Sequence, residues 1–95
     1  MTRKEILDAA AQIVTQGREE QYGSPEDCFN AIGNLWTDYL QAINSNSNVN
    51  FLRPSDVANM MILLKIARLA NGKPKADNWI DIAGYAACGG ELQEE

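Results

Sequence analysis

The chain has 95 residues, of which 8 are Lys or Arg and 13 are Asp or Glu, giving a formal net charge of −5 at pH 7. This length predicts a single domain over residues 1–95, and a homo-oligomer is a natural way for so small a chain to bury more surface. The acidic balance argues against binding to duplex nucleic acid, and the absence of His removes the commonest general base and transition-metal ligand.

The N-terminal segment predicts a helix rather than a targeting signal. Thr2 followed by Glu5 is the pattern of a capping box, and an apolar stripe that includes Ile6 and Ile13 continues the helix to Gln16. The segment lacks the apolar core of a signal peptide. We therefore expect a cytoplasmic protein in which Cys28 and Cys88 are reduced thiols.

The second predicted helix follows a polar loop over residues 17–23. Ser24 and Pro25 form a helix start, because Ser is a good N-cap and Pro fits the first helical position. Apolar residues at helical spacing, from Phe29 through Trp36 to Ile43, extend this helix to about Asn44. An Asn- and Ser-rich connection over 44–54 is predicted to be a flexible surface loop.

The stretch 55–72 is predicted to be the central helix, capped by Ser55 and ended by Gly72. It is apolar on almost every side, which is typical of a buried helix. It is too short and too charged to span a membrane. Lys65 and Arg68 lie three residues apart on one face of this helix, in apolar surroundings.

The last predicted helix begins at about Asp77 and runs back antiparallel to the central one, because the turn between them is short. Gly89 and Gly90 are expected to weaken its end, leaving 91–95 as a frayed tail. No strand pattern is present. The sequence thus predicts an all-α fold, a compact four-helix bundle with a central buried helix.

Two groups of residues are candidates for a ligand site. The first joins Lys65 and Arg68 to the acidic face of the last helix, which carries Asp77, Asp81 and Tyr85. Charged residues in apolar surroundings need partners. One interpretation is therefore internal pairing of the basic residues with Asp77 or Asp81, and the other is a site for an anionic ligand.

The second group is the loop before the second helix. Tyr22 and Gly23 precede a capped helix start, where free backbone N–H groups attract anions and an aromatic ring can stack on a nucleobase. Arg18 would add positive charge to the same loop. The alternative is that Tyr22 simply packs against the bundle and Gly23 makes the turn.

Two blocks of sequence, QYGSPEDCFNAIGNLW (21–36) and DVANMMILLKIARL…DNWIDIAGYAA (56–87), resemble a family of short phage and prophage proteins of unknown function. In that family a Y-G-S-P-E start precedes a K-I-x-R helix and a D-x-W-x-D-x-A-G-Y-A helix. The resemblance covers residues 6–89. More distantly, the pattern is similar to a phage domain associated with nucleotide modification and to the MazG-type all-α NTP pyrophosphohydrolases.

The phage family has no settled activity, so its resemblance implies no function. The first hypothesis is a small cytoplasmic protein of the bacterial host cell that binds an anionic nucleotide-type ligand without turning it over and without a cofactor, because the sequence lacks a metal-ligand cluster and His. Small phage proteins of this type include those that sequester a cyclic or ADP-ribose-type nucleotide signal of host antiviral defence. The candidate ligand-binding residues are Arg18, Tyr22, Gly23, Lys65, Arg68, Asp77, Asp81 and Tyr85.

The more distant resemblance implies an enzyme instead, a MazG-like nucleotide pyrophosphohydrolase or an accessory to nucleotide modification. The candidate Mg²⁺ ligands would be Glu19, Glu20, Asp77 and Asp81. The E-x-x-E and E-x-x-D spacings of those enzymes are not met, since the two Glu residues are adjacent and the two Asp residues are four apart. A third hypothesis is a protein-interaction module without a small ligand.

Overall fold

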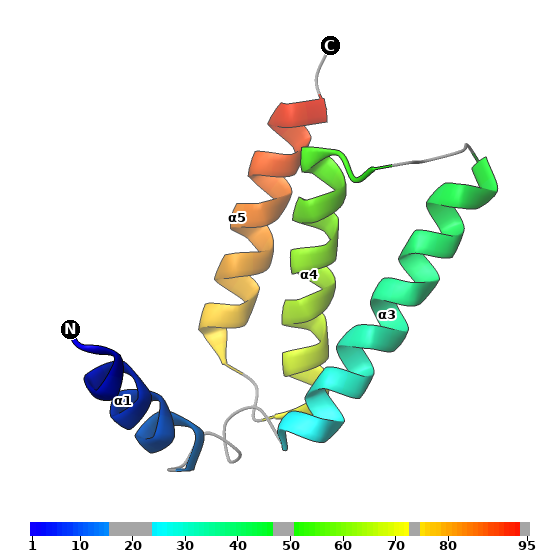
Figure 1. Cartoon of the computed structure of the whole chain (residues 1–95). Helices are drawn as coiled ribbons and strands as arrows, with labels where there is room; N and C mark the ends of the chain where they lie inside the picture. Colours follow the sequence, from blue (N-terminus) through cyan, green and yellow to red (C-terminus); the bar gives the residue numbers. More distant parts are fainter. Residues whose placement is uncertain (16–23, 47–50, 73–74, 94–95) are drawn as a thin grey trace.

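The computed structural model describes residues 1–15, 24–46, 51–72 and 75–93, and within these ranges it contains four helices and no strand. The helices are α1 (Arg3–Thr15), α3 (Pro25–Asn46), α4 (Pro54–Asn71) and α5 (Ala76–Gln93). The predicted all-α fold with four helices is confirmed. Figure 1 shows α3, α4 and α5 side by side, with α4 in the middle and antiparallel to both neighbours.

Local capping explains where the first two helices begin. The Glu5 backbone N–H donates to Thr2 Oγ1 at 3.2 Å, and the Thr2 N–H donates to Glu5 Oε1 at 2.9 Å. At the start of α3, the Asp27 N–H donates to Ser24 Oγ at 3.2 Å. Both predicted N-caps are therefore confirmed. The predicted end of the first helix, at Gln16, lies outside the described residues.

The start of α4 differs from the prediction. Ser55 is not the N-cap, because the helix already begins at Pro54 and Ser55 is buried in its first turn. Arg53 takes the cap position instead, and its backbone N–H donates to Asp56 Oδ2 at 2.9 Å. The side chain of Asp56, three residues after Arg53, therefore caps the N-terminus of α4. The end at Gly72 is as predicted, with its N–H donating to the carbonyl of Arg68 at 3.0 Å.

Two helices are longer than predicted. Helix α3 continues to Asn46, so the first residues of the predicted loop over 44–54 are helical. Helix α5 continues through Gly89 and Gly90 to Gln93, so most of the predicted frayed tail is helical as well. A Cβ atom at Gly89 would lie 3.0 Å from the Cβ of Ala58. This close packing on α4 holds the end of α5 despite the weak helix propensity of glycine.

The buried apolar residues of the described part lie where α4 meets its two neighbours. They are Cys28, Ile32, Ala58, Met60 and Ala67. A hydrogen bond of 2.7 Å from Trp36 Nε1 to the carbonyl of Met60 also joins α3 to α4. Because α3 and α5 cover only two sides of the central helix, Val57 and Ile66 remain 49% and 41% exposed.

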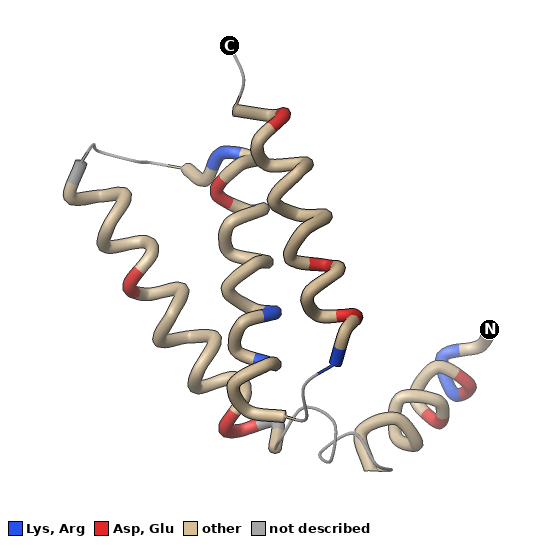
Figure 2. Tube along the Cα trace, turned by 180° about the vertical axis from the view of Figure 1, so that it is seen from behind, with Lys and Arg blue, Asp and Glu red and all other residues tan. Residues whose placement is uncertain are grey.

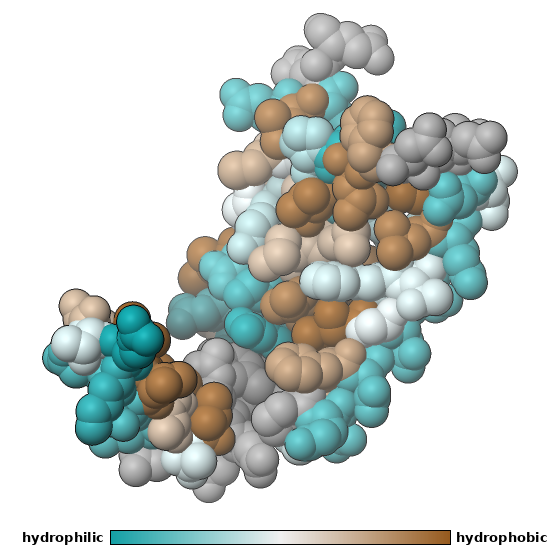
Figure 3. Space-filling view, viewed as in Figure 1, coloured by the Kyte–Doolittle hydropathy of each residue, from teal (hydrophilic) through white to brown (hydrophobic). Residues whose placement is uncertain are grey.

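Helix α1 lies apart from the other three helices (Figure 1), and in the described part of the chain it makes no contact with them. None of its residues is buried. The apolar stripe expected from the sequence is exposed, with Ile6 and Ile13 both at 53%. In Figure 3, hydrophobic residues are visible along α1 and over α4.

Within the described ranges, no helix combines the length and hydropathy needed to cross a membrane.

Candidate ligand site

One ion pair joins the two helices that carry the predicted charged residues. Lys65 Nζ on α4 lies 3.0 Å from Asp81 Oδ2 on α5. The Lys65 side chain is only 12% exposed, whereas that of Asp81 is 46% exposed. Figure 2 shows the basic residues in the second half of α4 beside the acidic residues in the first half of α5. For Lys65, the structure thus shows internal pairing with Asp81, one of the two interpretations left open by the sequence.

The Asn78 side chain lies on the same seam between α4 and α5, one turn before Asp81. Asn78 is 3% exposed, and its Nδ2 atom has no hydrogen-bond partner among the residues that the structure describes. A buried donor left without an acceptor costs about 1–3 kcal/mol. The described part of the chain therefore does not explain why a polar residue stands at position 78.

Sequence reasoning missed Asn78, although a signal for it exists. Asn78, Ile82, Tyr85 and Gly89 follow one another at intervals of three or four residues along α5, so they share one face of the helix. The tight contact between Gly89 and Ala58 identifies that face as the one against α4. A polar residue such as Asn78 on the face of a helix that packs against its neighbour needs a hydrogen-bond partner, and this pattern is the signal that the sequence offers.

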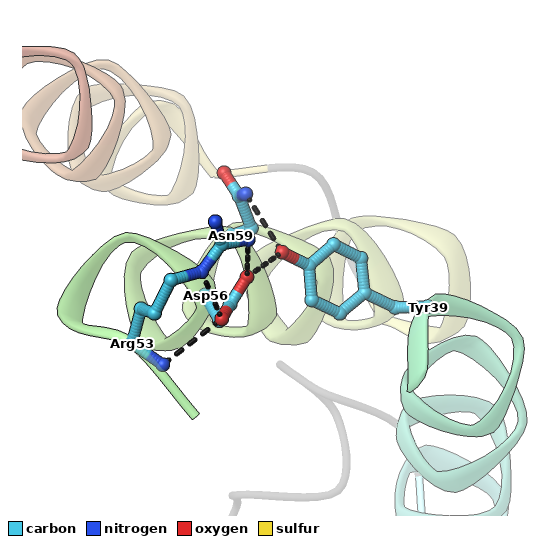
Figure 4. Close-up of polar contacts among 4 residues, drawn as sticks. All are labelled: Tyr39, Arg53, Asp56 and Asn59. Atoms are coloured by element: carbon cyan, nitrogen blue, oxygen red, sulfur yellow. Dashed lines mark hydrogen bonds and ion pairs between the residues drawn. The ribbon is translucent and has the colours of Figure 1, made fainter. Parts of the chain in front are cut away.

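A second polar cluster, shown in Figure 4, was also missed. It joins α3 to the start of α4 and centres on Asp56, which is 1% exposed. Tyr39 Oη donates to Asp56 Oδ1 at 2.6 Å, and Asn59 Nδ2 donates to Tyr39 Oη at 3.0 Å. Arg53 donates from Nε to Oδ2 at 3.0 Å and from Nη2 to Oδ1 at 3.1 Å.

The electrostatics of this second cluster indicate a structural role. The Arg53 guanidinium and then the Tyr39 hydroxyl hold the pKa of Asp56 well below its usual range. Burial raises the pKa of the Tyr39 hydroxyl. Each carboxylate oxygen of Asp56 already accepts two hydrogen bonds. The cluster therefore caps α4 and fixes α3 against it, and it offers little free capacity for a ligand.

Comparison with known proteins places the chain in a family. Residues 5–93 match the model of a domain of unknown function, DUF6378. The chain belongs to the DUF6378 family. This DUF6378 chain is also similar to two phage proteins, and no solved structure matches it.

Both similar phage proteins carry the name gene 55 protein. The one from Mycobacterium phage D29 is 37% identical over 90 residues, which cover 95% of this chain and 54% of the phage protein. The one from Mycobacterium phage L5 is 38% identical over 81 residues, covering 85% of this chain and 47% of the phage protein. The DUF6378 chain thus spans about half the length of these relatives. The expected membership of a phage family of unknown function is confirmed.

The structure brings together only part of the predicted site of this DUF6378 chain. Lys65 and Asp81 are in contact. Arg68 is half-buried one turn further along α4, while on α5 Asp77 is exposed and Tyr85 half-buried, each one turn from Asp81. The loop candidates Arg18, Glu19, Glu20, Tyr22 and Gly23 lie outside the described residues. Within the described ranges, no group of three or more metal-binding side chains is present.

Proposed function

We propose that this chain binds a small anionic, nucleotide-type ligand at the seam between α4 and α5. The observation that carries the proposal is the buried Nδ2 donor of Asn78, which lacks a partner in the described part of the chain and lies on the seam that holds Lys65. An oxygen of a phosphate group would supply the missing acceptor. Such an acceptor would remove the cost of burying the amide unpaired.

Two features of the seam would favour an anion beside the carboxylates of Asp77 and Asp81. An ammonium group has three donor hydrogens, so Lys65 can hold a phosphate oxygen while it keeps its contact with Asp81. Asn78 lies in the first turn of α5, where the helix dipole also favours negative charge. Tyr85 lies one turn beyond Asp81 and would be the nearest predicted aromatic surface for a base.

We propose that the chain binds its ligand without converting it. Its biological role would be to sequester a cyclic or ADP-ribose-type nucleotide signal. The pairing of Asp81 with Lys65 supports this choice, because it engages one of the candidate metal ligands. The phage origin of the two relatives is compatible with such a role. The alternative is MazG-like, Mg²⁺-dependent hydrolysis of a nucleotide.

The first test is a thermal-stability screen of the purified protein against NTPs, cyclic dinucleotides and ADP-ribose, with and without Mg²⁺. A ligand present at 100 times its Kd would stabilise the protein by about 2.7 kcal/mol. Chromatography of the recovered ligand separates the two alternatives, because a binder returns it intact and an enzyme returns it cleaved. Absence of stabilisation by every compound would contradict the proposal.

The sharpest variant for this screen is Asn78→Leu. Replacing an unsatisfied buried polar group by an apolar group of similar shape is neutral or stabilising, so the ligand-free variant should melt at or above the wild-type temperature. The same variant should lose most of the ligand-induced shift. An unchanged ligand response would show that Asn78 does not contact the ligand.

A matched pair of lysine variants controls for nonspecific charge effects. Lys65→Met removes the ammonium on the seam, and Lys4→Met removes that of the exposed Lys4–Asp8 pair on α1, where the ions lie 2.7 Å apart. Binding should weaken at least tenfold in the first variant and stay within twofold of wild type in the second. Equal weakening would point to general attraction of anions rather than to this seam.

A further inference from the structure

The chain exposes more surface than a folded monomer of its size. Its accessible surface is 7025 Å² for a mass of 10.5 kDa, whereas compact monomers of this mass expose about 5,400 Å². A protein–protein interface of ordinary size covers about 800 Å² on each partner. The excess is larger than one partner's share of such an interface, and it includes the surface of α1, none of whose residues is buried.

A partner that covers this surface would compensate for a small core only if it were present whenever the chain folds. Only five apolar residues of the described part are buried, and three of them are Cys or Ala. A core of this size contributes little hydrophobic stabilisation. A second copy of the chain is the partner that is always available, and association with it would stabilise the folded state directly.

The face of α5 that points away from α4 is the best candidate for the contact. Asn78 and Gly89 are buried against α4, and the residues on the opposite side of the helix are exposed. Trp79 is 64% exposed and Ile80 65% exposed. We call this surface the outer face of α5, and it consists of Trp79, Ile80, Ala83, Gly84, Ala87 and Gly90.

The glycines of α5 give an independent reason to choose this face. Gly89 has a packing reason within the chain, since a Cβ there would lie 3.0 Å from the Cβ of Ala58. By contrast, a Cβ at Gly84 or Gly90 would have no atom within 4 Å. Glycine inside a helix destabilises it relative to Ala. Close approach of another backbone to the outer face would account for both glycines.

Helix α3 contains a comparable glycine in different surroundings. A Cβ at Gly33 would also have no atom within 4 Å. However, the exposed polar residues Asn30, Asn34 and Thr37 lie beside Gly33 on the helix surface, and the exposed Phe29 lies one turn before it. The residues of the outer face of α5 carry no charge from Trp79 to Gly90, and the first charge beyond them is Glu91, one turn after Ala87. In a two-fold contact the same surface patch of each copy meets that of the other, so an uncharged patch lets two copies of this acidic chain meet without opposing like charges.

We propose that two copies of the chain associate through the outer face of α5, with the two α5 helices crossing near Gly84. Trp79 and Ile80 from each copy become buried in this contact. The seam that carries Lys65 and Asn78 lies on the other side of α5, so dimer formation and the proposed ligand binding can be tested separately.

The test is sedimentation velocity of the full chain over a range of protein concentrations. The wild-type protein should be a dimer that dissociates on dilution. Gly84→Gln adds a long side chain to the proposed crossing point and should raise the dimer Kd at least tenfold, although Gln favours the helix more than Gly does. The matched control, Gly33→Gln, makes the same change in open space on α3 and should leave the Kd unchanged.

A cross-linking measurement keeps the proposal testable if Gly84→Gln fails to fold. Ala87→Cys in a Cys88→Ser background should form a covalent dimer under mild oxidation, whereas Thr37→Cys in the same background should not. A wild-type chain that stays monomeric at high concentration would overturn the proposal. Equal effects of the Gly33 and Gly84 variants, or equal cross-linking at both Cys positions, would overturn the assignment to α5.

Discussion

At the scale of single residues, Asp56 shows how a buried charge is made compatible with a small core. Its carboxylate accepts hydrogen bonds from Arg53 and Tyr39, and breaking such charged hydrogen bonds costs about 1.5–3 kcal/mol. We expect Asp56→Asn to lower the free energy of unfolding by about 2–3 kcal/mol, as measured by urea denaturation. Asp38→Asn, an exposed change on α3, should stay within about 0.5 kcal/mol of wild type.

The pH dependence of stability follows from the same residue. The pKa of Asp56 is lowered in the folded state, so the unfolded chain binds the proton more readily. The contribution of Asp56 to stability is therefore complete above its unfolded pKa of about 3.9 and is lost as pH falls toward the lower folded value. Urea denaturation between pH 5 and pH 2 should show a shallower loss in Asp56→Asn than in wild type. Parallel curves would mean that other carboxyl groups control acid unfolding.

At the scale of helices, Gly89 and Gly33 differ in their surroundings: Gly89 is tightly packed against α4, and Gly33 faces open space. Gly89→Leu would force a side chain into the contact between α5 and Ala58, and we expect destabilisation of about 1–3 kcal/mol. Gly33→Leu adds the same side chain where nothing lies within 4 Å, and the better helix propensity of Leu should stabilise α3. Thermal melts of both variants test this difference. Similar losses in the two would show that α5 does not pack this closely on α4.

Helix ends also show where local and tertiary effects compete. The N-caps Thr2 and Ser24 were predicted correctly because each acts on a backbone group three residues away. The end of α5 was predicted wrongly, since two adjacent glycines favour fraying. Contact of Gly89 with α4 outweighs that local preference. Helix propensity therefore described the chain well only where no neighbouring helix was involved.

At the scale of the whole molecule, the chain is more extended than a compact domain. Its radius of gyration is 16.0 Å, against about 12 Å for a compact domain of this length. If self-association completes the fold, unfolding becomes concentration-dependent by mass action. The melting temperature should then rise by about 3 °C for each tenfold increase in protein concentration. Differential scanning calorimetry measures this, and a constant melting temperature would indicate a monomer.

The sequence by itself determined the all-α class, the approximate place of each helix and the membership of a phage family. Those properties depend on periodicity, caps and motifs, which act over a few neighbouring residues. Only the tertiary structure decided that Lys65 pairs with Asp81, that Tyr39 reaches Asp56, and that Asn78 is buried without a partner in the described part of the chain. These contacts depend on how the helices are rotated and shifted against each other. Helical spacing fixes which residues share a face, but the neighbour of that face is set by packing over the whole chain.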